Sequence, residues 1–278
     1  RHSAHPMRKN IPVEFIYQVF ALIVIVILVH AAYVAIIRPN ADAVLAAQAA
    51  ALEIDEPPSS DQSLFVMVKD YEQEACFVLM FWALAIMGYK GISTIRHRGL
   101  LNLDLIPLAE GVRILPEDAL VFSRRIQALP ADQRQSLLPR TLLAALHRFG
   151  STRNIQDVAH AMHASCEAEG ERLDAELAMI RYIAWAIPSV GFIGTVRGIG
   201  QALGNAYKAV QGDILEVTQS LGVAFNSTLI ALLISIVLMF LLHQLQLLQE
   251  RYVLDTEAYC EEKLTRRLHT RPMEAGGV

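Results

Sequence analysis

Charge is scarce in this chain of 278 residues: charged residues make up 19% of it, whereas hydrophobic residues make up 54%. This composition is too apolar for an ordinary soluble domain, and it excludes an intrinsically disordered chain. An excess of positive charge is also lacking, because 24 Lys and Arg stand against 28 Asp and Glu. Since nucleic-acid-binding proteins usually have a basic surface, this class is excluded as well. A membrane protein is the first interpretation.

Cysteine and catalytic motifs are similarly rare. Three cysteines, odd in number and far apart, predict neither a disulfide framework nor a zinc site: Cys76, Cys166 and Cys260. One predicted helix carries a mixed group that spreads over too wide an arc for a tetrahedral metal site: His160, Met162, His163 and Cys166. No Gly-x-Ser-x-Gly, His-Glu-x-x-His or phosphate-binding loop occurs. We therefore expect no enzyme activity, no metal and no cofactor.

Four apolar segments are present instead, at residues 13–37, 75–89, 182–203 and 221–242. A transmembrane helix needs about 20 apolar residues, so the second segment is short and requires tilt or local thinning of the bilayer. We predict an all-α integral membrane protein with four transmembrane helices. The last two are expected to extend into a cytoplasmic helical bundle.

The orientation follows from Lys and Arg, because loops rich in these residues stay in the cytoplasm. Basic residues flank one side of the segments: Arg8, Lys9, Lys90, Arg96, Arg98, Arg172, Arg181 and Arg251. We therefore predict that both termini are cytoplasmic. The remaining parts are a cytoplasmic N-terminus (1–12), an acidic external or periplasmic loop (38–74), a cytoplasmic helical region (90–181), an external turn (204–220) and a cytoplasmic C-terminal helix and tail (243–278).

Capping signals predict three helices in the cytoplasmic region. One begins near Pro116–Glu117–Asp118, a second runs from about Ser136 to Gly150, and residues 151–154 cap a third. The third is expected to run into the third apolar segment without a break.

The third and fourth segments each carry a stripe of small, weakly polar residues at helical spacing. The stripes are Gly191, Gly194 or Thr195, Gly198 and Ala202, and Ser220, Ala224, Ser227 or Thr228, Ala231 and Ser235. Such stripes allow membrane helices to pack closely and to exchange hydrogen bonds. The alternative is a lining, in which Pro188 permits a hinge and the hydroxyls of Thr195 and Thr228 contact water or a carboxyl group.

One motif is specific. Residues 183–199 read IAWAIPSVGFIGTVRGI, with Pro, two residues, Gly, two residues, Gly-Thr-Val, one residue and Gly. This motif resembles the signature of the MotA/TolQ/ExbB proton channel family, and the resemblance covers about residues 167–268. The fourth segment keeps Thr228, but Ala231, Ser235 and Val237 replace the usual Gly, Ala and Pro. Arg197 is another departure, and we expect it to reach toward the external surface.

The resemblance implies a homopentamer in the bacterial inner (cytoplasmic) membrane. The pentamer would surround a dimer of a second subunit, whose one transmembrane helix carries an ionisable Asp. It further implies a stator that couples proton flow, or sodium flow, to mechanical work. Thr195 and Thr228 would line the ion pathway with secondary contacts from Asn226, Ser227 and Ser235, whereas helix hinge and packing roles would fall to Pro188, Gly191, Gly194 and Gly198. His30, in the peripheral first segment, would be structural.

The absence of carboxylates fits this role independently. The third and fourth segments contain no Asp or Glu, and proton paths through membranes usually need ionisable groups. The acid is therefore expected to come from a partner. Two alternatives stay open: a non-conducting membrane scaffold that recruits a partner through its cytoplasmic helices, and a stand-alone transporter, which the lack of an internal repeat disfavours.

Overall fold

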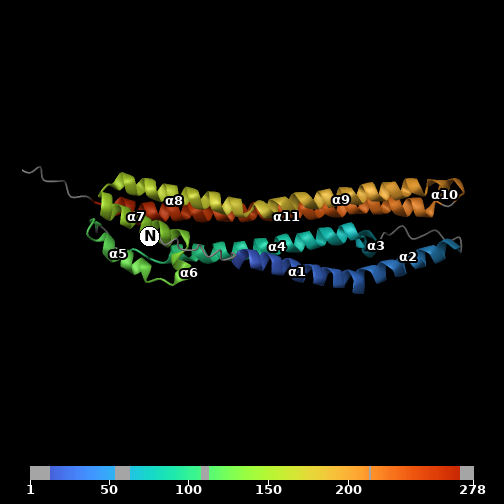
Figure 1. The fold of residues 1–278 in the computed structure, drawn as a ribbon, viewed down its shortest axis with the longest axis horizontal. Helices are drawn as coiled ribbons and strands as arrows, with labels where there is room; N and C mark the ends of the chain where they lie inside the picture. The colour runs from blue at the N-terminus through green and yellow to red at the C-terminus, as the bar shows by residue number, and fades with distance from the viewer. Residues whose placement is uncertain (1–12, 54–62, 108–112, 213, 270–278) are drawn as a thin grey trace, which may run out of the picture. The chain divides into compact units, whose positions relative to one another are not determined.

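The computed structural model describes residues 13–53, 63–107, 113–212 and 214–269, and nearly all of them are helical (Figure 1). Within these residues the only β pairing is an isolated parallel bridge between Ile114 and Leu268. Four helices are long and apolar enough to cross a membrane: Glu14–Gln48, Tyr71–Asn102, Ile155–Gly204 and Leu215–Arg267. The prediction of an all-α membrane protein with four spanning helices is confirmed.

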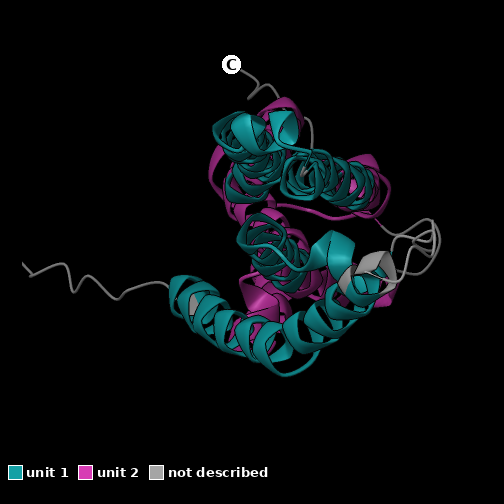
Figure 2. Ribbon diagram, turned by 90° about the vertical axis from the view of Figure 1, so that its right-hand side faces the viewer, with its two compact units in different colours: residues 1–87, 179–242 teal, residues 88–178, 243–278 magenta. Residues whose placement is uncertain are grey.

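The chain divides into two compact units, which Figure 2 distinguishes by colour. Unit 1 consists of residues 1–87 and 179–242, and unit 2 of residues 88–178 and 243–278. The helices that belong mainly to unit 1 are α1 (Val13–Ala32), η1 (Tyr33–Ile37), α2 (Arg38–Glu53), α3 (Leu64–Val68), α4 (Tyr71–Arg98), α9 (Ala178–Gly204), α10 (Ala206–Val210) and α11 (Leu215–Lys263). Both α4 and α11 extend past the unit 1 boundary in sequence.

In unit 1, α1 lies beside α4 (Figure 1). The Tyr17 hydroxyl donates to the Ala85 carbonyl at 3.3 Å, and the Trp82 indole N–H donates to the Gln18 carbonyl at 3.0 Å. Both rings thus place their polar atoms on backbone carbonyls, which removes the cost of an unpaired donor among apolar side chains.

Segment 38–74, predicted as an external loop, is helical over Arg38–Glu53 and Leu64–Val68. The first apolar segment was predicted to end at residue 37, directly before Arg38 and Pro39. Instead, the five-residue π-helical turn η1 precedes Pro39. The proline, which has no N–H, thus lies where the helix changes from π-helical to α-helical hydrogen bonding. The helix therefore continues through the proline. The structure does not describe residues 1–12, 54–62 and 213. These include Arg8, Lys9 and some carboxylates of the predicted acidic loop.

Unit 2 contains η2 (Gly99–Asn102), α5 (Ala119–Gln127), α6 (Ala131–Arg134), α7 (Leu137–Thr152), α8 (Ile155–Glu176) and η3 (Thr265–Arg267), with the later part of α11. The predicted start signals stand at these helices. Ser136 directly precedes α7, and the Asn154 side chain accepts from the Gln156 N–H at the start of α8. The helix expected to continue into the third apolar segment runs over Ile155–Gly204, and a single turn residue at Leu177 separates α8 from α9 within it.

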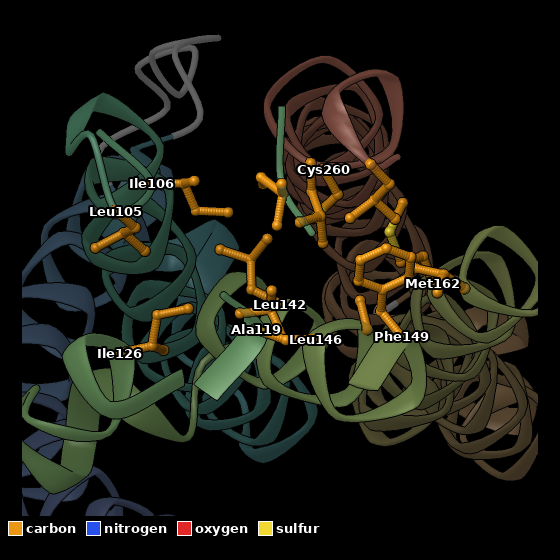
Figure 3. Packing of buried hydrophobic residues seen from close by; sticks show 14 of the residues in the cluster. Leu105, Ile106, Ala119, Ile126, Leu142, Leu146, Phe149, Met162 and Cys260 are labelled. Atoms are coloured by element: carbon orange, nitrogen blue, oxygen red, sulfur yellow. The ribbon is translucent and has the colours of Figure 1, made fainter. Parts of the chain in front are cut away.

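Large apolar side chains form the core of unit 2. Leu142, Leu146 and Phe149 of α7 are fully buried in it, together with Met162 of α8 and Cys260 of α11 (Figure 3). The same cluster includes Leu100, Leu105, Ile106, Ile114, Ala119, Ile126, Leu138, Ala145, Val158, Leu264 and Leu268. Unit 2 is thus held together as a water-soluble domain would be, by burial of apolar area.

Candidate functional site

Helices α9 and α11 of unit 1 lie side by side (Figure 1) and meet along their small-residue stripes. We call this contact, between residues 184–202 and 220–235, the α9–α11 seam. A Cβ added at Gly198 would lie 2.7 Å from both the backbone N of Ala224 and the backbone O of Ser220. A Cβ at Gly191 would collide with the Cβ of Ala231. The two backbones approach so closely that only glycine fits at these positions.

Two threonine hydroxyls face one another across the seam. Thr195 of α9 and Thr228 of α11 hydrogen-bond to each other through their Oγ1 atoms. Thr195 Oγ1 also lies 3.0 Å from the Ala224 carbonyl, and Thr228 Oγ1 lies 3.3 Å from the Gly191 carbonyl. Each hydroxyl has one proton and two acceptor sites. When Thr195 donates to Ala224, Thr228 can donate to Thr195 and keeps its own lone pairs unused.

A second hydrogen bond crosses the seam at the proline of α9. Pro188 has no N–H, so the carbonyl of Ala184, four residues earlier, loses its usual helical partner. The Ser235 hydroxyl of α11 donates to this carbonyl at 3.1 Å. The acceptor that the proline leaves free is thus satisfied by the neighbouring helix.

The remaining predicted lining residues differ in position. Ser227 is 1% exposed, and its hydroxyl donates to the Val223 carbonyl of its own helix at 2.8 Å. It also accepts from the Gln73 amide of α4 at 3.3 Å. Asn226 is half-buried on α11 and takes no part in the hydrogen bonds across the seam. The structure thus brings Thr195, Thr228, Ser227 and Ser235 to one seam and leaves Asn226 aside.

Charged residues at the start of α4 and directly before it belong to the segment that was predicted as an external loop. Glu72 binds the Arg197 guanidinium through both of its oxygens, at 2.7 Å to Nε and 2.7 Å to a terminal nitrogen. Asp70 lies 4.0 Å from the same guanidinium. Burial raises the pKa of the Asp70 carboxyl, whereas the positive charges of Lys69 and Arg197 act in the opposite direction. Arg197, expected to reach toward the external surface, is held by an ion pair with Glu72.

A separate ionic group joins the first helix to α4. The Glu74 carboxylate lies 2.7 Å from His30 Nδ1 and 2.5 Å from an Arg38 nitrogen. The Glu74 side chain is 12% exposed, and that of His30 is 59% exposed. His30 thus contacts α4 within unit 1.

The His and Cys side chains of α8 make separate contacts. Among the described residues, no cluster of three His, Cys, Asp or Glu could hold a metal ion. His163 instead lies 2.8 Å from the Glu257 carboxylate, and Cys166 is buried in the interior of unit 2.

Residues 133–258 match the sequence model of the MotA/TolQ/ExbB proton channel family. This range includes the whole seam and excludes α4. The comparisons with curated proteins and with solved structures gave no match. The family is one of channels and transport proteins, which indicates an ion-channel-like function in a membrane. The chain is a multi-pass membrane protein that carries, over residues 133–258, a domain of the MotA/TolQ/ExbB proton channel family.

Proposed function

We propose that the chain is the pentameric inner-membrane subunit of a proton-driven motor, or a sodium-driven one, and that a second subunit carries the intramembrane Asp. Both termini are cytoplasmic in this proposal. The observation that carries it is the Thr195–Thr228 pair, which lies in a seam whose two apolar segments, 182–203 and 221–242, contain no Asp or Glu. These two segments provide hydroxyls that can contact an acid, but they provide no acid themselves.

The pair suits an acid that changes its protonation state. A protonated Asp can donate to the free lone pairs of Thr228 while Thr228 donates to Thr195. An ionised Asp needs a donor, so the Thr228 hydroxyl turns its proton toward the carboxylate, an interaction stronger than one between neutral groups. The two states of the acid therefore bind the pair differently. Differential binding is what an ion needs in order to shift a conformational equilibrium and do work.

The test uses the complex as it exists in its native membrane. We would purify the tagged chain with its associated subunits in mild detergent, measure the mass of the assembly, and sequence any subunit with one apolar helix. The expected result is five copies of this chain with an Asp-bearing partner. A monomer, or an assembly whose partner lacks an intramembrane acid, would contradict the proposal.

Ion flux is then measured in vesicles that contain the purified complex, with an internal pH-sensitive dye and an imposed membrane potential. Thr195→Val and Thr228→Val should each lower the flux at least tenfold with no change in assembly mass. Thr218→Val is the matched control, because the Thr218 hydroxyl is exposed and bonds the Ile214 carbonyl of its own helix at 3.0 Å. Normal flux in both seam variants would exclude this lining, and repeating the assay without sodium distinguishes the two ions.

A second candidate is a non-conducting membrane scaffold, favoured by the tight glycine contacts of the seam, which need no ion to explain them. This candidate predicts no flux in the purified complex. It also predicts that Thr195→Val leaves the cellular activity of the assembly unchanged, so the same variants decide between the two functions.

A further inference from the structure

The glutamine of α4 is an unusual polar group to bury in a span. Gln73 is 0% exposed, and its amide nitrogen donates to the Met67 carbonyl at 3.1 Å and to Ser227 Oγ at 3.3 Å. Its Oε1 is buried and has no hydrogen-bond partner among the described residues. A buried amide oxygen without a partner is costly, and such a cost points to a ligand or a path that uses the atom.

The neighbouring Glu72 also reaches the seam. A Cβ added at Gly194 would lie 2.5 Å from the Ser227 Cβ and 3.2 Å from the Glu72 Cγ. Both side chains therefore pack against the residue that directly precedes Thr195. Residues 72 and 73 of α4, although more than 100 positions away in sequence, lie beside the hydroxyls of the candidate pathway.

The charged side chains beside the seam are paired with one another. Arg197 lies two residues beyond Thr195 on α9, and an isolated guanidinium there would repel an approaching cation. Glu72 binds it through both carboxylate oxygens, so the pair presents little net charge. The Asp70 carboxylate, 4.0 Å from the guanidinium, lies 3.9 Å from the Lys69 ammonium group, so these two charges also oppose one another.

We propose that α4 forms the outer section of the ion pathway. Gln73 positions the Ser227 hydroxyl and accepts, through its free Oε1, a hydrogen bond from the hydrated proton or cation that enters. Glu72 neutralises Arg197, so that the cation can approach Thr195 and Thr228. This inference rests on the proposed function and extends it to a helix outside the matched family domain.

The first test is flux through vesicles that contain the purified complex. Gln73→Leu removes both the donor and the acceptor at similar volume, and we expect about a tenfold lower flux. Gln219→Leu, at an exposed position of α11, is the matched control. Should Gln73→Leu assemble poorly, Gln73→Glu keeps an acceptor oxygen and, when its buried carboxyl is protonated, one donor for Ser227. A complex of this variant should therefore retain most of the flux at low pH.

The second test uses the sign of the charge effects. Glu72→Gln leaves Arg197 positive, so flux should fall about tenfold, and the loss should shrink as the external ionic strength rises. Arg197→Gln leaves the carboxylates and should raise flux about twofold. The double variant Glu72→Gln/Arg197→Gln should return close to the original flux. An ion pair that only holds helices together would instead make both single variants lose flux, with no dependence on salt.

The outcomes separate this inference from the function on which it rests. If Thr195→Val abolishes flux while Gln73→Leu and Glu72→Gln do not change it, the pathway omits α4 and the inference is wrong, whereas the proposed function stands. Equal losses in Glu72→Gln and Arg197→Gln would also overturn the inference. A complex without any flux overturns both.

Discussion

The α9–α11 seam of unit 1 and the apolar core of unit 2 are held together by different kinds of contact. In the seam, Gly191, Gly194 and Gly198 let two backbones approach, and hydroxyl groups bond to carbonyls of the facing helix. In the unit 2 core, Leu142, Phe149 and their neighbours are buried completely. One contact depends on the absence of side chains, and the other depends on their bulk.

The difference is the one expected between a contact formed in water and one formed in lipid. In water, burial of apolar area stabilises a core by roughly 25 cal/mol per Å². In lipid this gain is lost, because the hydrocarbon tails are as apolar as leucine, so close packing and interhelical hydrogen bonds must hold helices together. Accordingly, the large side chains of the seam helices point away from it: Phe192 is 64% exposed and Phe225 is 68% exposed.

The comparison predicts that removing bulk is most harmful in unit 2. Phe149→Ala should lower the free energy of unfolding by about 3–5 kcal/mol, because it combines lost burial with a cavity. Leu120→Ala is the control, since Leu120 lies on α5 of the same unit and is 69% exposed. Chemical unfolding of the full chain in mild detergent measures both. Similar small losses in the two variants would mean that the unit 2 core is not what stabilises that unit.

Adding bulk should instead be most harmful in the seam. Gly198→Ala places a methyl group 2.7 Å from backbone atoms of α11, and we expect a loss of about 1–3 kcal/mol. Gly200→Ala, two residues along the same helix, meets nothing within 4 Å and should be neutral or slightly stabilising, since alanine favours helix. The same unfolding experiment compares them. Equal effects at positions 198 and 200 would show that the close approach of α9 and α11 does not contribute to stability.

Much of this arrangement could be predicted from local patterns. The small-residue stripes lie on α9 and α11 at helical spacing, and Asn154 caps α8 as its residue type indicates. The contacts of Gln73 with Ser227 and of Glu72 with Arg197 could not be predicted, because these partners are more than 120 residues away and leave no periodic signal. The many carboxylates of segment 38–74 indicated a solvated loop instead of a packed helix. Proline at position 39 indicated a helix end, since sequence spacing does not reveal a π-helical turn.

The smallest expected effect tests the hydrogen bonds of the seam. Ser235→Ala removes the donor to the Ala184 carbonyl, and membrane hydrogen bonds of this kind contribute about 0.6 kcal/mol on average and at most about 1.7 kcal/mol. We expect the upper half of that range, because Pro188 leaves this carbonyl without a helical partner. Ser189→Ala is the control, since its hydroxyl bonds the Trp185 carbonyl of its own helix.

A double-mutant cycle shows whether the proline is the cause. In a Pro188→Ala background, residue 188 regains an N–H that can bond the Ala184 carbonyl, so removing the Ser235 hydroxyl no longer leaves a buried acceptor unpaired. The loss from Ser235→Ala should therefore shrink by at least half in that background. An unchanged loss would mean that Ser235 acts independently of Pro188. The glycine contacts alone would then stabilise the seam. The seam and the core of unit 2 would differ in the size of their side chains and not in their hydrogen bonding.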